Sequence, residues 1–163
     1  VAEVLLDHPP VNALDSAGWG KLAETVVSLG VDPEVRVIVL GAAGRGLCAG
    51  VDVKELARDA SLITKVNKGC YDAFAAIHDC PVPVIAACHG FVLGGGIGLV
   101  GSCDLIVSSD DASFGLPEID RGALGAASHL MRMFPGGNRN ANGPLTRISQ
   151  TMQRRSTFGL SEK

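Results

Sequence analysis

The stretch HGFVLGGGIGLVGSCD, residues 89–104, decides how the rest of this chain is interpreted. Five glycines stand in it within eight positions, at 94, 95, 96, 98 and 101, directly after an apolar run. Glycine inside a regular element costs roughly 0.5–1 kcal/mol relative to alanine, so the cluster needs a physical reason. Either something approaches the backbone closely here, or the chain simply turns.

The sequence around this stretch predicts strands that alternate with helices. Strands are expected within residues 1–10, 35–41, 81–90 and 103–115, and helices at 15–30, 51–59, 61–80 and 123–134. The runs at 35–41 and 81–90 are continuously apolar, as in strands buried on both faces of a sheet, while 41–50 reads as a glycine-rich loop. This alternation predicts an α/β fold with largely parallel pairing.

Composition narrows the function classes. The chain has 163 residues, 47% of them hydrophobic, and a net charge of -3, with no basic patch that would suit nucleic acid. Its longest apolar runs are far shorter than the ~18–20 residues of a membrane span. The five cysteines form no C-x-x-C pair, so we expect no zinc site, no disulfide framework and a cytoplasmic location.

The glycine cluster has two chemical interpretations. Residues 96–101 match G-x-G-x-x-G, but the next strand begins near Asp104 and leaves no room for the crossover helix of a dinucleotide-binding unit. The other interpretation is an oxyanion hole, since a glycine run that opens a helix exposes backbone N–H groups. A second glycine-rich loop, GLCAGVDV at 46–53, also follows a strand and opens a helix. Two such loops can face each other at one sheet edge.

The motifs RVIVLGAAGRGLCAGVDVKEL (36–56) and PVPVIAACHGFVLGGGIGLVGSCDLIVSSDDASFGLPEIDRGALG (81–125) resemble the enoyl-CoA hydratase/isomerase, or crotonase, superfamily. The resemblance implies a spiral of repeated ββα units that binds an acyl-CoA thioester, with coenzyme A as part of the substrate and no separate cofactor. By motif position, it makes the N–H groups of Val51 and Gly95 the donors that hold the thioester oxygen as an enolate forms. It further implies acyl-CoA contacts at Ala13, Ala49, Gly50, Asp52, Lys54 and Gly94.

The acids of this site depart from the pattern of the hydratases that the sequence resembles. Those enzymes have one glutamate in GGGxE, where this chain has Gly98, and a second in FGxPE, which is Glu118 here. A lone glutamate suits proton shuttling. Asp120, with Arg121, resembles a subgroup that includes ring-opening hydrolases of bacterial steroid breakdown, and Asp120 is a second catalytic candidate.

Plainer interpretations of these residues stay open. Glu118 and Asp120 also suit the start of a helix, and Lys54 suits a solvated face. Cys48, beside the predicted hole, is expected to be a packing residue rather than a nucleophile, and His89 to satisfy a backbone group.

Three functions therefore stand side by side. The first is a hydratase/isomerase-type enzyme with Glu118 as acid and base. The second is a hydrolase that opens the ring of a cyclic β-keto acyl-CoA, and the third is an inactive remnant that binds coenzyme A or a partner. We expect an acyl-CoA-binding core at 1–135 and an atypical tail at 136–163, without most of the C-terminal helices that cover the acyl pocket in the family. The resemblance also implies a homo-oligomer, a trimer or hexamer, weakened by that altered C-terminus.

Overall fold

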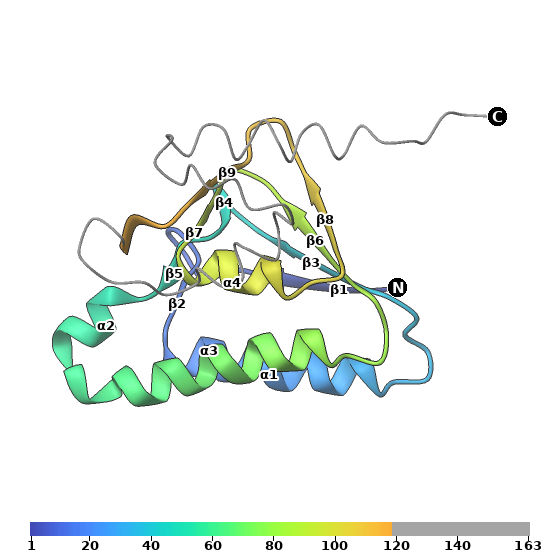
Figure 1. The fold of residues 1–163 in the computed structure, drawn as a ribbon, viewed down its shortest axis with the longest axis horizontal. Helices are drawn as coiled ribbons and strands as arrows, with labels where there is room; N and C mark the ends of the chain where they lie inside the picture. The colour runs from blue at the N-terminus through green and yellow to red at the C-terminus, as the bar shows by residue number, and fades with distance from the viewer. Residues whose placement is uncertain (119–163) are drawn as a thin grey trace, which may run out of the picture.

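The chain winds as a spiral in which successive turns add strands to the same parallel sheets (Figure 1). The computed structural model describes residues 1–118. One sheet has the order β1-β3-β6-β8, from Ala2–Leu6, Ile38–Ala42, Val84–Cys88 and Leu105–Ser108. A second has the order β4-β7-β9, from Gly46–Cys48, Phe91–Leu93 and Ser113–Gly115. All these pairings are parallel, which confirms the α/β class expected from the sequence.

The helices join one turn of the spiral to the next. They are α1 (Ser16–Gly30), α2 (Val53–Arg58), the 3₁₀ turn η1 (Ala60–Leu62), α3 (Ile63–His78) and α4 (Gly95–Gly101). The short strands β2 (Ala13–Leu14) and β5 (Gly50–Val51) pair as a third, two-stranded sheet. The carboxylate of Asp15 accepts a hydrogen bond from the Gly18 N–H and caps α1.

Helices α1 and α3 lie side by side in one layer, and α4 lies between this layer and the strands (Figure 1). The apolar faces of all three helices meet the sheets in one core. Its largest fully buried side chains are Trp19, Ile38, Leu40, Leu47, Ile77, Ile97 and Leu99. Because α4 is completely buried apart from its first residue, the chain on either side of it is held in a fixed place.

Several of the sequence-based element assignments are wrong. Residues 41–50, expected to be a loop, contain the end of β3, all of β4 and the start of β5, because parallel neighbours supply ladder partners even to glycine-rich segments. Strand β7 was not expected at all. β3 begins at Ile38 rather than at residue 35, since the N–H of Val35 donates to the Asp32 carbonyl in a turn.

Several expectations fall outside the described residues. These are the helix at 123–134, Asp120, the boundary at 135, the tail at 136–163 and the loss of C-terminal helices.

Candidate active site

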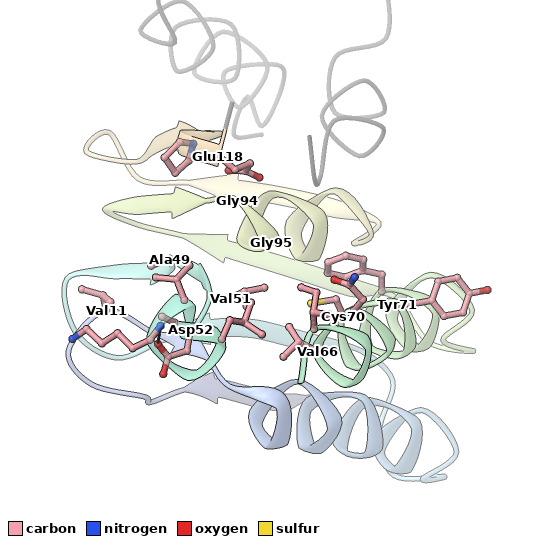
Figure 2. Close-up of a pocket in the computed structure, with 18 residues that line it drawn as sticks. Val11, Ala49, Val51, Asp52, Val66, Cys70, Tyr71, Gly94, Gly95 and Glu118 are labelled. Carbon is pink, nitrogen blue, oxygen red and sulfur yellow. Dashed lines mark hydrogen bonds between the residues drawn. The ribbon is translucent and has the colours of Figure 1, made fainter. Parts of the chain in front are cut away.

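A cavity of about 790 Å³ opens between the two glycine loops and the helices α2 and α3. Figure 2 shows Val11, Ala49 and Asp52 on one side of it, and Val66, Cys70 and Tyr71 on the other. Its full lining is Val11, Ala13, Ala49, Val51, Asp52, Val53, Lys54, Leu56, Ile63, Val66, Asn67, Cys70, Tyr71, Phe74, Gly94, Gly95, Pro117 and Glu118. Of the site residues expected from the sequence within residues 1–118, all except Gly50 therefore line one cavity.

The two glycine loops touch backbone to backbone. A Cβ on Gly50 would lie 2.9 Å from the Gly95 nitrogen, and one on Gly96 would lie 2.6 Å from the Cys48 carbonyl oxygen. Gly50 also has a φ of +91°, which disfavours any other residue. The sequence-based explanation of the cluster, room for a ligand against bare backbone, thus omits a packing reason: without these glycines the loops could not meet.

The N–H groups of Val51 and Gly95 lie at this junction. The Asp52 N–H donates to the Leu14 carbonyl at 2.9 Å. Successive amides of an extended strand point to opposite sides, so the Val51 N–H points away from Leu14. Gly95 is the first residue of α4, whose N–H has no acceptor within the helix. Both predicted donors therefore lie on adjacent loops that line one cavity.

The Glu118 carboxylate lies against the same junction. A Cβ on Gly94 would lie 3.2 Å and 3.4 Å from its two oxygens, a tight contact that glycine avoids at this position. The φ of Gly94 is +51°, a second reason for glycine. Figure 2 shows Glu118 above Gly94 and Gly95. A carboxylate thus stands next to the predicted oxyanion donors.

Helix α2 brings polar groups to the side of the cavity that faces α3 (Figure 2). Asp52 caps the helix by accepting a 2.9 Å hydrogen bond from the Lys54 N–H, and the Lys54 side chain is exposed at the rim. Glu55 accepts hydrogen bonds from the backbone N–H and the hydroxyl of Ser16, at 2.8 and 2.9 Å. These two hydrogen bonds join α2, which begins two residues after Val51, to the start of α1.

Asn12 fixes the loop that precedes β2. It is 4% exposed with a φ of +52°, and its amide donates to the carbonyls of Ala43 and Gly46 at 2.8 and 3.0 Å. Its side-chain oxygen accepts from the His8 N–H at 2.7 Å. The sequence does not single out Asn12, because nothing in its neighbourhood distinguishes it from an ordinary turn asparagine.

The thiols near the site, buried Cys48 and half-buried Cys70, are poorly ionised. Burial raises the pKa of Cys48 to about 11 from 9.0. It also raises the pKa of Cys70, which lines the cavity, to about 12, with a further contribution from nearby Cys48. A neutral thiol is a weak nucleophile, so Cys48 fits the packing role expected of it. His89 lies outside the cavity lining, with its ring nitrogen 3.1 Å from the Gly44 carbonyl oxygen.

One wall of the cavity was missed by the sequence analysis. Helix α3 contributes Ile63, Val66, Asn67, Cys70, Tyr71 and Phe74 to the lining. Of these, Val66, Cys70 and Phe74 belong to a stripe at helical spacing that is indistinguishable in sequence from a core-facing stripe. Only Val66 is fully buried, whereas Cys70 and Phe74 are half-buried and border the cavity.

Comparison with known proteins decides the family. Residues 1–139 match the family model described as enoyl-CoA hydratase/isomerase. The chain belongs to the enoyl-CoA hydratase/isomerase family. It is also similar in fold to the crystal structure of enoyl-CoA hydratase from Bacillus anthracis, with a TM-score of 0.78 and 28% identity over 91% of this chain and 58% of that one. The crotonase-like spiral of ββα units is thereby confirmed.

Within the enoyl-CoA hydratase/isomerase family, two similar relatives carry the same printed name, (7aS)-7a-methyl-1,5-dioxo-2,3,5,6,7,7a-hexahydro-1H-indene-carboxyl-CoA hydrolase. The Rhodococcus jostii protein is 56% identical over 83% of this chain and 53% of its own length. The Mycobacterium tuberculosis protein is 52% identical over 83% of this chain and 56% of its own length. The chain therefore spans about half the length of these relatives.

Gly98 stands where the resembling hydratases have the first glutamate, in GGGxE, and its surroundings leave no room for a side chain. Gly98 lies on buried α4, and a Cβ on it would lie 2.5 Å from the Phe74 ring. The space for a second acid is thus filled by an aromatic side chain from α3.

The described residues show neither a metal-binding group nor a membrane-spanning helix. Among residues 1–118, no three His, Cys, Asp or Glu side chains are grouped so as to hold a metal ion. No helix in the same range has the length and apolar character needed to cross a bilayer.

Proposed function

We propose that the chain carries the thioester-binding part of a hydrolase that opens the ring of a cyclic β-keto acyl-CoA. The N–H groups of Val51 and Gly95 would hold the thioester oxygen, and Glu118 would act as acid and base. The similarity to two proteins named as CoA hydrolases of a dioxo bicyclic acid favours this reaction over hydration or isomerisation.

The observation that carries the proposal is the arrangement at the loop junction. Glu118 lies against Gly94, one residue from the Gly95 donor, and both line the same cavity as Val51. Backbone donors fixed in advance at a developing oxyanion are among the strongest contributions to catalysis. The Phe74 ring fills the space that a second acid at position 98 would need, which supports a reaction that requires only one carboxylate.

The proposed reaction requires only one water molecule and one carboxylate. Glu118 takes a proton from water as the water oxygen bonds to the ring ketone carbon β to the thioester. The resulting alkoxide collapses to a carboxylic acid, and the bond between the α- and β-carbons breaks. Its electron pair passes to the α-carbon and the thioester oxygen as an enolate, which the Val51 and Gly95 N–H groups stabilise. Glu118 then returns the proton to the α-carbon, so one water is added across one C–C bond.

The experiment is incubation of the protein with a cyclic β-diketone CoA thioester in water enriched in oxygen-18, followed by mass spectrometry. We expect a ring-opened acyl-CoA, heavier by one water, with the label in the new carboxylate. Crotonyl-CoA and a 3-enoyl-CoA serve as parallel substrates. Turnover of either of those, with no ring opening, would replace the hydrolase with a hydratase or an isomerase. Calorimetry with CoA and acyl-CoA that detects no binding at millimolar ligand would remove the proposal.

A further inference from the structure

Two aromatic rings stand behind the loop junction, and three glycines make room for them. The Phe74 and Trp19 rings meet edge to face, with centroids 5.7 Å apart at 86°. A Cβ on Gly95 would lie 3.1 Å from the Trp19 indole, and one on Gly69 would lie 2.9 Å from the Trp19 Cβ. Trp19 is therefore wedged between α3 and the first residue of α4.

Trp19 is held by shape rather than by a hydrogen bond. It is 0% exposed, and its indole N–H has no acceptor within residues 1–118. A buried N–H without a partner costs about 1–3 kcal/mol, so the packing of this ring outweighs a definite penalty. The ring backs Gly95 on the side away from the cavity and gives Phe74 a rigid support.

Phe74 is the member of the pair that borders the cavity. A Cβ on Gly98 would lie 2.5, 2.7 and 3.2 Å from three atoms at the far end of its ring, so the ring occupies the space that a side chain from α4 would fill. α4 therefore contributes only the backbone of Gly95 to the lining, with Gly94 just before it. The width of the cavity beside Gly95 depends on where this one ring lies.

The two sides of the cavity differ in chemistry. The α2 side has the charged residues Asp52 and Lys54, whereas the α3 side is lined mainly by apolar groups around Phe74. A thioester whose oxygen lies at Val51 and Gly95, between the two sides, would direct its polar coenzyme toward α2 and its acyl group toward α3.

From this geometry we propose that Phe74 is a specificity-determining residue that limits the size of the acyl group, and that Gly98 sets the position of its ring. The inference rests on the proposed function, because it takes the α3 side as the acyl side. Truncating Phe74 opens space next to Gly95. A methyl group at Gly98 pushes the ring toward the cavity, because Trp19 and α4 close its other sides.

The test compares the affinities of two unreactive thioesters by calorimetry, on the full chain. The small ligand is butanoyl-CoA, and the large one is a decalin-carboxyl-CoA without a β-carbonyl group. In Phe74→Ala we expect the affinity for the large ligand, relative to the small one, to rise about tenfold, since even one methylene in an apolar pocket alters selectivity by roughly 10–200-fold. In Gly98→Ala we expect the same ratio to fall about tenfold.

Three controls separate specificity from stability. Phe74→Leu keeps most of the packing and should shift the ratio in the direction of Phe74→Ala, by less. Val27→Ala, on the exposed face of α1, should leave the ratio unchanged. Affinity for CoA alone should not change in any Phe74 or Gly98 variant, whereas general loosening would weaken both thioesters and CoA together.

The outcomes are distinct for the two proposals. Opposite shifts in Phe74→Ala and Gly98→Ala support the assignment. If the unmodified protein binds both thioesters but the ratio is the same in the Phe74 and Gly98 variants, the specificity assignment is wrong while the proposed function stands. If the unmodified protein binds no thioester, the proposed function fails, and this inference fails with it.

Discussion

The middle of the cavity and its α3 side are built from different parts of the chain. The middle of the cavity is lined by main-chain atoms of Val51, Gly94 and Gly95. The two loops that carry them touch, and the space between the loops is too small for a side chain. On the α3 side, the lining consists of side chains such as Tyr71 and Phe74, on a helix that is partly open to solvent.

Under the proposed function, the contrast amounts to a division of tasks. A thioester group is the same in every acyl-CoA, and backbone donors recognise it without depending on which side chain stands at each position. The acyl group differs between substrates, and side chains on one helix face can change without disturbing the loops. The following experiments break or sharpen this comparison, from the largest expected effect to the smallest.

The largest effect is expected at the backbone junction, from Gly95→Leu. A Cβ there would lie 3.1 Å from the buried Trp19 ring, so the leucine side chain has no room and displaces the start of α4, and with it the predicted donor N–H. Calorimetry should detect no acyl-CoA binding, whatever the acyl group. The matched control is Gly20→Ala on α1, where a Cβ meets nothing within 4 Å. It should bind normally and be more stable by about 0.5–1 kcal/mol, since alanine suits a helix better. Normal binding by Gly95→Leu would show that the oxygen is held elsewhere.

The next effect concerns the acid that lies against this junction. Glu118→Gln keeps the size and hydrogen bonding of the side chain but removes its titration. Turnover of any substrate found should fall by about 10²–10⁴-fold, with the dissociation constant for the acyl-CoA little changed. Glu24→Gln, exposed on α1, is the control for a lost carboxylate. If turnover of the Glu118 variant is intact, the proton-carrier assignment is wrong and Asp120 becomes the next candidate.

A smaller effect is expected from Asn12, the buried residue that fixes the loop before β2. Asn12→Ala removes two donated hydrogen bonds and places a Cβ-bearing residue at a φ of +52° without the compensation that asparagine has. We expect the free energy of unfolding in urea to fall by about 2–4 kcal/mol.

Asn12→Gly separates the two causes. It loses the same hydrogen bonds but accepts the positive φ, so it should be more stable than Asn12→Ala by about 1 kcal/mol. Equal stabilities would mean that the hydrogen bonds account for the whole loss. In both variants, any loss of affinity should be the same for small and large acyl groups, because the change acts on the backbone part of the cavity.

The smallest effect concerns pH. A thiol whose pKa is raised by folding binds its proton more tightly in the native state than in the unfolded chain, so it lowers stability only at alkaline pH. The pKa of Cys48 is raised from 9.0 to about 11 and that of Cys70 to about 12. Stability should therefore be unaffected by these thiols below about pH 8.5 and fall progressively above pH 9. The fall of the melting temperature should be shallower in Cys48→Ala. An identical slope would contradict the buried, neutral thiol.

The sequence predicts the parts of the site that depend on motif order. Val51, Gly95 and Glu118 stand at motif positions that the resemblance to the family assigns, and the fold brings all three to one cavity. It does not predict Phe74, because an apolar residue at helical spacing looks the same whether its far end meets a core or a cavity. That distinction depends on Gly98, which lies 24 positions away in sequence and makes room for the ring.

The fold is predictable to a similar degree. The long apolar runs predict β3 and β6, while β4, β5 and β7 are two or three residues long and owe their extended form to neighbouring strands. Such strands have no periodicity of their own. The reason for the glycines at 50 and 96 was partly missed for the same cause: a contact between distant loops leaves no local pattern.

The order of the strands has a consequence for biosynthesis. In both larger sheets each strand pairs with the strand from the turn before it, so a nascent chain leaving the ribosome can add each turn to a surface that already exists. Both backbone donors lie in earlier turns than Glu118, which follows β9. During translation, the two proposed thioester donors are therefore made before the proposed proton carrier, and under the proposed function a partly synthesised chain would bind a thioester before it could act on one.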